Sequence, residues 1–205
     1  MRCEWRRQAI LKVARETFLE HGYDGASMSD IAARLGGSKG TLYNYFKGKD
    51  ELFAACIEAE CAGIAGPSGA CAGPRPALDA ALQSVGEALL ARVCSMSWLT
   101  SFQLVAPQAR RSPELALRVD EAGVAPARRQ IAQALADSGS VPTNAVGEAV
   151  ERFIGLCLGD LPMRLMLGLA SPPSPGQIQQ RVAHAVRAWL SACGAGDELR
   201  PDTDR

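Results

Sequence analysis

The chain of 205 residues lacks any C-x-x-C pair, although it contains seven cysteines, and it has only two histidines. Without such pairs, neither a zinc site nor a disulfide framework is expected, and we predict no metal and no cofactor. Most cysteines are interpreted as small buried hydrophobes of a reduced, cytoplasmic protein. The sequence also leaves a thiol sensor as an alternative, with Cys56, Cys61 and Cys71 as its candidates.

The hydropathy pattern of the sequence also predicts neither a signal peptide nor a membrane span. The segment MRCEWRRQAILK is charged and has no continuous apolar core. The most apolar run, from Phe153 to Leu169, is interrupted by Asp160, Pro162 and Arg164. We therefore expect no membrane partner.

The chain has no net charge, which argues against nonspecific binding of polyanions by the protein as a whole. Residues 1–52 nevertheless hold nine Lys and Arg against seven Asp and Glu, and they include all four lysines of the chain. Any surface that binds DNA must therefore be local and lie in this first quarter.

Apolar residues recur with helical spacing nearly throughout, and no alternating strand pattern is present, so the fold class is predicted to be all-α. The first helix ends near Gly22, and a fourth runs over 49–61. Residues 62–76 are rich in Gly, Pro and Ala and are expected to form a linker or loop. The later helices are predicted near 77–94, 96–106, 113–121, 124–138, 143–168 and 175–193.

Residues 27–46 have the pattern of a helix-turn-helix. Ser27 begins the first of its two helices, and Asp30 completes a capping-box-like pattern. The turn is Gly36-Gly37, and Ser38 caps a second helix that Leu42 anchors to the core. This second helix has the polar and aromatic character needed to enter a DNA major groove.

The same region resembles the DNA-binding domain of the TetR family of bacterial regulators. The resemblance is carried by Ile10-Leu11, Ala14, Phe18, Gly22-Tyr23, Ser27, Asp30-Ile31-Ala32, Ser38-Lys39-Gly40-Thr41-Leu42-Tyr43, Phe46, Lys49 and Leu52. It implies a three-helix DNA-binding domain in residues 1–62 and a helical effector-binding and dimerisation domain in residues 63–205. Around residues 112–169 the sequence is also similar to the AefR-like subgroup.

Two residues depart from the family pattern. Gly37 stands where a small apolar residue such as Val is typical, which leaves the turn less packed. Gly48 stands where Ser or Asn often caps the fourth helix, a loss of about 1 kcal/mol that Gly partly recovers.

The resemblance places the DNA contacts in and around the second helix of the motif. Lys39 and Thr41 are expected to meet base edges, Gly40 lets the backbone approach the groove, and Asn44 is suited to read adenine. The remaining candidates are expected to contact phosphates through hydroxyl groups or charge. The complete set is Ser27, Ser29, Lys39, Gly40, Thr41, Tyr43, Asn44, Tyr45, Lys47 and Lys49.

The C-terminal domain offers candidates for an apolar effector pocket with a few polar groups. Ordinary helix-bundle core is the competing interpretation for each of them, and an i, i+4 ion pair with Arg164 explains Asp160 without a ligand. The candidates are Met96, Trp98, Phe102, Gln103, Arg118, Phe153, Cys157 and Asp160.

No catalytic constellation is present in the sequence, and His21 and His184 have no partner at a metal-ligand spacing. The resemblance implies a homodimeric, ligand-responsive transcriptional regulator, most often a repressor, that pairs through the helices near 143–168 and 175–193. Its partners would be a near-palindromic DNA operator and a small molecule. The alternatives are a helical carrier or enzyme with a degenerate DNA module, and an activator or thiol-based sensor.

Overall fold

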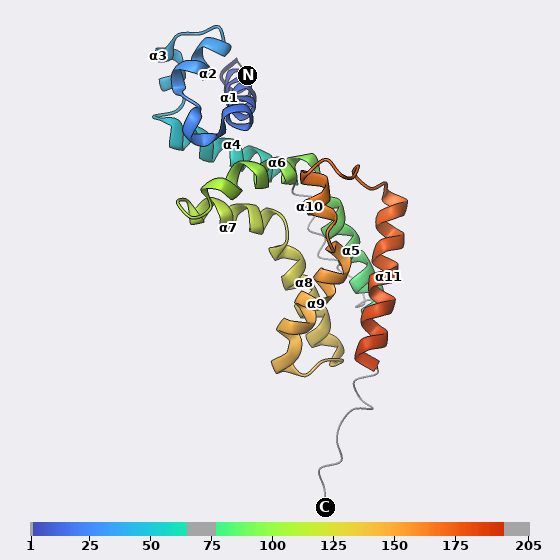
Figure 1. Cartoon of the computed structure of the whole chain (residues 1–205). Coiled ribbons are helices and arrows are strands. Elements are labelled where there is room, and N and C mark those ends of the chain that lie inside the picture. The colour runs from blue at the N-terminus through green and yellow to red at the C-terminus, as the bar shows by residue number, and fades with distance from the viewer. Residues whose placement is uncertain (1, 65–76, 195–205) are drawn as a thin grey trace, which may run out of the picture. The chain divides into compact units, whose positions relative to one another are not determined.

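The computed structural model describes residues 2–64 and 77–194, and every regular element within these ranges is a helix, as predicted (Figure 1). The chain divides into two compact units. One contains Met1–Ala65 and Met96–Ala122, and the other contains Gly66–Ser95 and Gly123–Arg205. The predicted domain boundary at residues 62 and 63 stays a prediction, because the first unit also includes the helices of residues 96–122.

The first unit is built on α1 and α4. Helix α1 packs against α2 and α4, and α4 packs against α6 and α7. Helix α4 extends to Ile64, three residues into the predicted linker, and residues 65–76 of that linker lie outside the described residues. The elements of this unit are α1 (Arg2–Gly25), α2 (Met28–Arg34), α3 (Lys39–Tyr43), α4 (Lys49–Ile64), α6 (Met96–Val105), the 3-10 helix η1 (Ala106–Gln108) and α7 (Pro113–Ala122).

Aromatic side chains hold α1 and α4 together. Phe18 and Phe53 are both buried, and their rings meet edge to face with centroids 5.0 Å apart. Tyr23 joins them, with its ring centroid 5.0 Å from that of Phe53. Such pairs stabilise a core beyond the apolar area that they bury, so the two helices provide a firm base for α2 and α3.

In the second unit, α5 packs against α8, α9 and α11, and α9 packs against α8 and α11. Phe153 and Trp189 are fully buried and meet edge to face, and the Trp189 indole N–H donates to the Ala149 carbonyl at 3.2 Å. Its elements are α5 (Leu78–Val93), α8 (Ala125–Ser138), the 3-10 helix η2 (Thr143–Ala145), α9 (Val146–Leu158), α10 (Leu161–Met166) and α11 (Pro175–Gly194).

The prediction of one continuous helix over 143–168 is wrong. The chain leaves α9 at Gly159, whose φ of 50° and ψ of −134° are accessible chiefly to glycine, and Pro162 then stands in the first turn of α10. Arg181 on α11 secures the break, because its guanidinium donates to the carbonyls of Cys157 at 2.7 Å and Leu158 at 2.9 Å. The end of α9 is therefore capped by a side chain from another helix.

Among the described residues, no single helix is long and apolar enough to cross a membrane. In the same described residues, the bent pair of Leu78–Val93 and Met96–Gln108 passes that test by length and composition alone.

Candidate nucleic-acid interface

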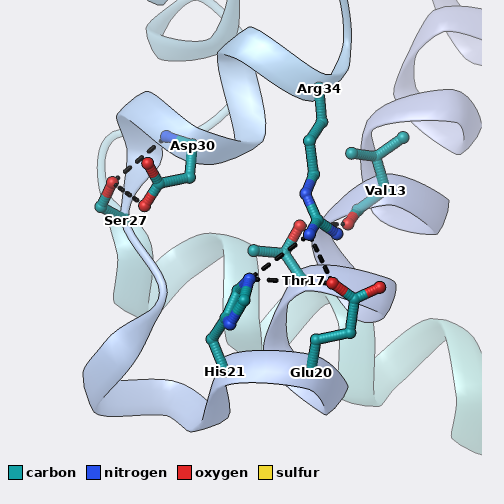
Figure 2. Close-up of polar contacts among 7 residues, drawn as sticks. All are labelled: Val13, Thr17, Glu20, His21, Ser27, Asp30 and Arg34. Carbon is teal, nitrogen blue, oxygen red and sulfur yellow. Dashed lines mark hydrogen bonds and ion pairs between the residues drawn. The ribbon is translucent and has the colours of Figure 1, made fainter.

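The connection between α1 and α2 begins with a break in the helix at Gly22. Its φ of 69° is a left-handed conformation that favours glycine, as predicted for the end of the first helix, although one further helical turn continues to Gly25. Ser27 then caps α2 by accepting from the Asp30 N–H at 3.2 Å (Figure 2). The Ser27 hydroxyl also donates to the Asp30 carboxylate at 2.6 Å, so the predicted cap is confirmed.

The turn between α2 and α3 has the predicted glycines and the predicted cap. Gly36 has a positive φ of 64°, and the Gly37 N–H donates to the Ala32 carbonyl at 3.2 Å. Ser38 accepts from the Thr41 N–H at 3.2 Å, and the two hydroxyl groups lie 3.0 Å apart. Short local bonds thus define where the second helix of the motif begins.

Helix α3 presents one buried side and one exposed side. Leu42 and Phe46 are each 2% exposed and anchor the helix, as predicted. The predicted DNA contacts Lys39, Gly40 and Asn44 are exposed, and Tyr43 is 48% exposed. Exposed groups at the start of a recognition helix are free to meet a DNA groove.

The other predicted contacts differ in exposure. Ser29 and Lys47 are exposed, whereas Tyr45 is half-buried. Lys49 is half-buried, and its ammonium group donates to the carbonyls of Tyr23 at 2.8 Å and Ala26 at 3.2 Å. It also lies 4.4 Å from the centre of the Tyr23 ring, so Lys49 ties α4 to the α1–α2 connection. Its role as a phosphate contact stays a prediction.

A polar cluster that was not predicted from the sequence joins α1 to α2. Figure 2 shows the Arg34 side chain pointing toward Glu20 and His21. Arg34 pairs with the Glu20 carboxylate and lies 3.3 Å from Nε2 of His21. The hydrogen bond from Arg34 lowers the pKa of Glu20, and the same contact raises the pKa of Arg34. Because all three groups are exposed, these contacts contribute little to stability. We interpret the cluster as one that helps to orient α2 relative to α1.

Arg7, near the start of α1, also went unnoticed in the sequence. Its guanidinium carbon lies 5.5 Å from the centre of the Phe46 ring, which places a cation over the aromatic residue that follows α3. A cation separated from a ring by 39 positions leaves no periodic signal in a sequence. This contact connects the start of α1 to the end of the helix-turn-helix.

The predicted effector residues fall into both compact units. The first unit holds Met96 and Phe102, which are exposed, and Trp98, which is buried with its ring centroid 5.3 Å from that of Phe102. It also holds Gln103 and Arg118, both exposed, and Arg118 pairs with the carboxylate of Glu58.

The remaining effector candidates belong to the second unit. Phe153 and Cys157 are fully buried there, and Asp160 is exposed and lies 3.7 Å from Arg164. The ion pair that competes with a ligand role for Asp160 is therefore present. The effector pocket as a whole stays a prediction.

The first unit contains two open hollows beside its helices. One, of about 540 Å³, is lined by the end of α1 together with Gln103, Leu104, Pro107 and Gln108. The other, of about 430 Å³, is lined by residues that include Phe53, Leu115 and Arg118. Of the predicted effector residues, Gln103 lines the first hollow and Arg118 lines the second. Neither hollow is lined by the whole predicted set.

Of the cysteines in the described residues, Cys56, Cys94 and Cys157 are buried and Cys61 is half-buried. In residues 2–64 and 77–194, no group of three His, Cys, Asp or Glu side chains is arranged to hold a metal ion. Burial raises the pKa of Cys56 and that of Cys157 to about 12, and it also raises the pKa of Cys61. Protonated thiols react slowly, which weakens the thiol-sensor alternative at these positions. Cys71 lies outside the described residues.

Comparisons with known families and relatives agree with this architecture. The family described as bacterial regulatory proteins, tetR family, matches residues 10–56, and the AefR-like transcriptional repressor C-terminal domain matches residues 80–195. The HTH-type transcriptional repressor AcnR of Corynebacterium efficiens is 27% identical over 188 residues, which cover 88% of this chain and 92% of the relative. AcnR of Corynebacterium diphtheriae is 40% identical over 60 residues, 29% of this chain and 32% of that protein.

Two solved structures are similar over nearly the whole chain. The flavonoid-responsive regulator FrrA is 29% identical with a TM-score of 0.69, covering 92% of this chain and 97% of its own. A TetR transcriptional regulator from Agrobacterium tumefaciens is 27% identical with a TM-score of 0.71, covering 91% and 93% of the two chains. The fold of this chain therefore occurs in other transcriptional regulators.

Proposed function

Because the chain belongs to the TetR family of bacterial regulatory proteins, with an AefR-like C-terminal domain, we propose that it is a cytoplasmic, homodimeric repressor released from its operator by a small molecule. As a family member it is a DNA-binding transcriptional regulator. The observation that carries the proposal is the helix α3, capped by Ser38 and anchored by Leu42, with its opposite side exposed.

That geometry supports the DNA contacts that we propose. Lys39 and Thr41, in the first turn of α3, read base edges, while Tyr43, which is 48% exposed, contacts a phosphate through its hydroxyl group. A two-fold dimer would place two such helices in successive major grooves about 34–36 Å apart, so the operator is a near-palindrome. Gly40 and Asn44 keep the roles at the groove that the sequence predicts, and the remaining predicted contacts bind phosphates.

The dimer forms through the last helices of the second unit. Exposed apolar side chains on these helices support this assignment: Leu156 on α9 is 41% exposed, Met163 on α10 is 55% exposed and Leu190 on α11 is 36% exposed. Apolar surface of this kind is buried favourably when two copies associate.

A small molecule would act by preferring one of two dimer geometries, and its leverage equals its differential affinity for them. The solved structure named as a flavonoid-responsive regulator supports a small organic effector, and the residues that would bind it stay a prediction. The carrier or enzyme alternative has no observation in its favour beyond the near-neutral charge.

The test is a gel-shift titration at two salt concentrations. The probes are the DNA upstream of the protein's own gene and the duplexes that it selects from a randomised library. We expect tight binding to a short near-palindrome, with an affinity that falls steeply with salt. If the protein neither binds the upstream DNA nor selects any duplex, the proposal is wrong.

Two substitutions separate base reading from phosphate contact. Thr41→Ala should change the order of preference among operator variants, whereas Tyr43→Phe should weaken binding to all of them by a similar factor. Gln133→Ala on α8, far along the chain from the motif, is the matched control and should change neither. Equal losses on every variant for Thr41→Ala would remove that residue from the base-reading set.

A further inference from the structure

Arg6, near the start of α1, lies against the turn that leads into α3. Its Nη2 atom is 3.2 Å from the position that a Cβ atom would occupy at Gly37. Arg6 also lines a small depression that Gly37, Ser38 and Thr41 share. A side chain from the beginning of the chain thus reaches the residues at which the DNA-reading helix begins.

The glycine at position 37 makes this arrangement feasible. The resemblance to the TetR family implies a small apolar side chain such as Val at this position. Its Cβ atom alone would lie 3.2 Å from Nη2 of Arg6, so the guanidinium would have to shift to make room. Gly37 does not have a positive φ, so the backbone does not require glycine here. We therefore attribute the glycine at position 37 to the space that Arg6 occupies, and not to a backbone conformation that only glycine adopts easily.

The Arg6 guanidinium has no partner of its own within the described residues. It makes no ion pair with a carboxylate there, in contrast to Arg34, which pairs with Glu20, and Arg7, which lies over the Phe46 ring. A half-buried guanidinium with free donors beside a DNA-reading helix matches the geometry of a phosphate group, which it binds through two parallel hydrogen bonds.

We propose that Arg6 is a further DNA-binding residue, which uses the space left by Gly37 to bind an operator phosphate beside the groove that α3 enters. This proposal rests on the proposed function. The proposal couples the two residues. A side chain at position 37 should remove the contact between Arg6 and the phosphate as effectively as removal of the Arg6 guanidinium does.

The experiment measures how operator affinity depends on salt, with a duplex that the wild-type protein selects from a randomised library. Each phosphate contact contributes about 0.9 to the slope of log affinity against log salt concentration. Arg6→Met should therefore reduce the slope by about 1.8 for a dimer, and affinity for all duplexes should fall together. Arg6→Lys should retain most of the slope, since the charge remains.

Gly37→Val tests the pairing without touching the cation. It should reduce the slope in the same direction as Arg6→Met, and it should add nothing further in the Arg6→Met background. The thermal unfolding temperature of Gly37→Val should be equal to or above that of the wild type, because a side chain at this position reduces the conformational entropy of the unfolded chain. Gly37→Val thus carries the test even if Arg6→Met were to unfold.

Lys12→Met is the matched control, because Lys12 is an exposed cation on another face of α1. It should leave the slope within half a unit of the wild-type value. If the wild type binds its duplex and both Arg6→Met and Gly37→Val retain the full slope, the role of Arg6 is wrong while the proposed function stands. If the wild type selects no duplex at all, the proposed function fails and the role of Arg6 fails with it.

Discussion

Replacement of Gly86 by alanine should destabilise the second compact unit, although alanine is the better helix former. Gly86 is buried on α5, where α5 packs against α9 and α11. An added Cβ would lie 2.6 Å from Cγ1 of Val182 and 3.4 Å from Sγ of Cys157, and ordinary contacts begin near 3.4 Å. Val182 is fully buried and β-branched, so it has little freedom to turn away.

The size of the effect follows from two opposing contributions. Overpacking a close-packed interior costs about 1–3 kcal/mol, and the short contact with a stiff side chain places Gly86→Ala in the upper part of this range. Alanine gains about 1 kcal/mol over glycine in a helix. The expected net loss in the free energy of unfolding is therefore about 1–2 kcal/mol.

A second substitution isolates the contact itself. Val182→Ala alone should cost about 2 kcal/mol, because it removes two buried methyl groups and leaves a cavity. With those methyl groups gone, Gly86→Ala no longer meets Val182, fills part of the cavity and keeps its helical gain. In that background Gly86→Ala should therefore stabilise the unit, which corresponds to a coupling energy of about 2–3 kcal/mol.

The assay is urea unfolding followed by circular dichroism, with all variants at one protein concentration because association shifts apparent stability. Gly147→Ala is the control, since its Cβ would meet nothing within 4 Å, and it should be neutral or stabilise by up to about 1 kcal/mol. The packing argument fails if Gly86→Ala is as stable as the wild type, or if the two changes add within about 0.5 kcal/mol.

Two further predictions concern Lys49 and the buried thiols. Lys49→Met should lower the free energy of unfolding by about 1–3 kcal/mol, because it removes two charge-assisted hydrogen bonds. Because Lys49 is also a predicted phosphate contact, the same change should reduce the salt slope of DNA binding, and an unchanged slope would limit Lys49 to its structural role. The thiols of Cys56 and Cys157, with pKa values raised from 9.0 to about 12, should contribute stability below pH 9 that declines as the pH rises from 9 to 12. Urea titrations across this range should show a shallower decline for Cys56→Ala and Cys157→Ala, and identical profiles would contradict the burial of these thiols.

The parts of the fold that the sequence predicted well are those determined within a few residues. Ser27 and Ser38 cap their helices by accepting from an N–H three positions later, and Gly22 breaks α1 through its own φ. Leu42 and Phe46 are i, i+4 neighbours on one side of the chain, so the helical period alone identifies them as anchors.

The features that the sequence did not predict depend on distant partners. The helix expected over 143–168 breaks at Gly159, and the cap for the broken end comes from Arg181 on another helix. The contact of Lys49 with the Tyr23 ring joins residues 26 positions apart. Neither has a periodic signature, and a mid-helix glycine is compatible with a continuous helix as well as with a break.

The two departures from the family pattern are better understood through residues elsewhere than through the glycines themselves. Gly48 provides no side-chain cap for α4, yet the Glu51 carboxylate accepts from the Lys47 N–H at 2.6 Å. An acidic side chain in the first turn of the helix thus satisfies a backbone donor at its start, and its charge is also favourable there. Gly37 likewise lacks a side chain, and Arg6 lies in the space beside it. In both cases a residue elsewhere in the chain compensates for the missing side chain. We therefore expect Val at position 37 to stabilise the turn while displacing Arg6 from the surface at which we propose that it binds DNA.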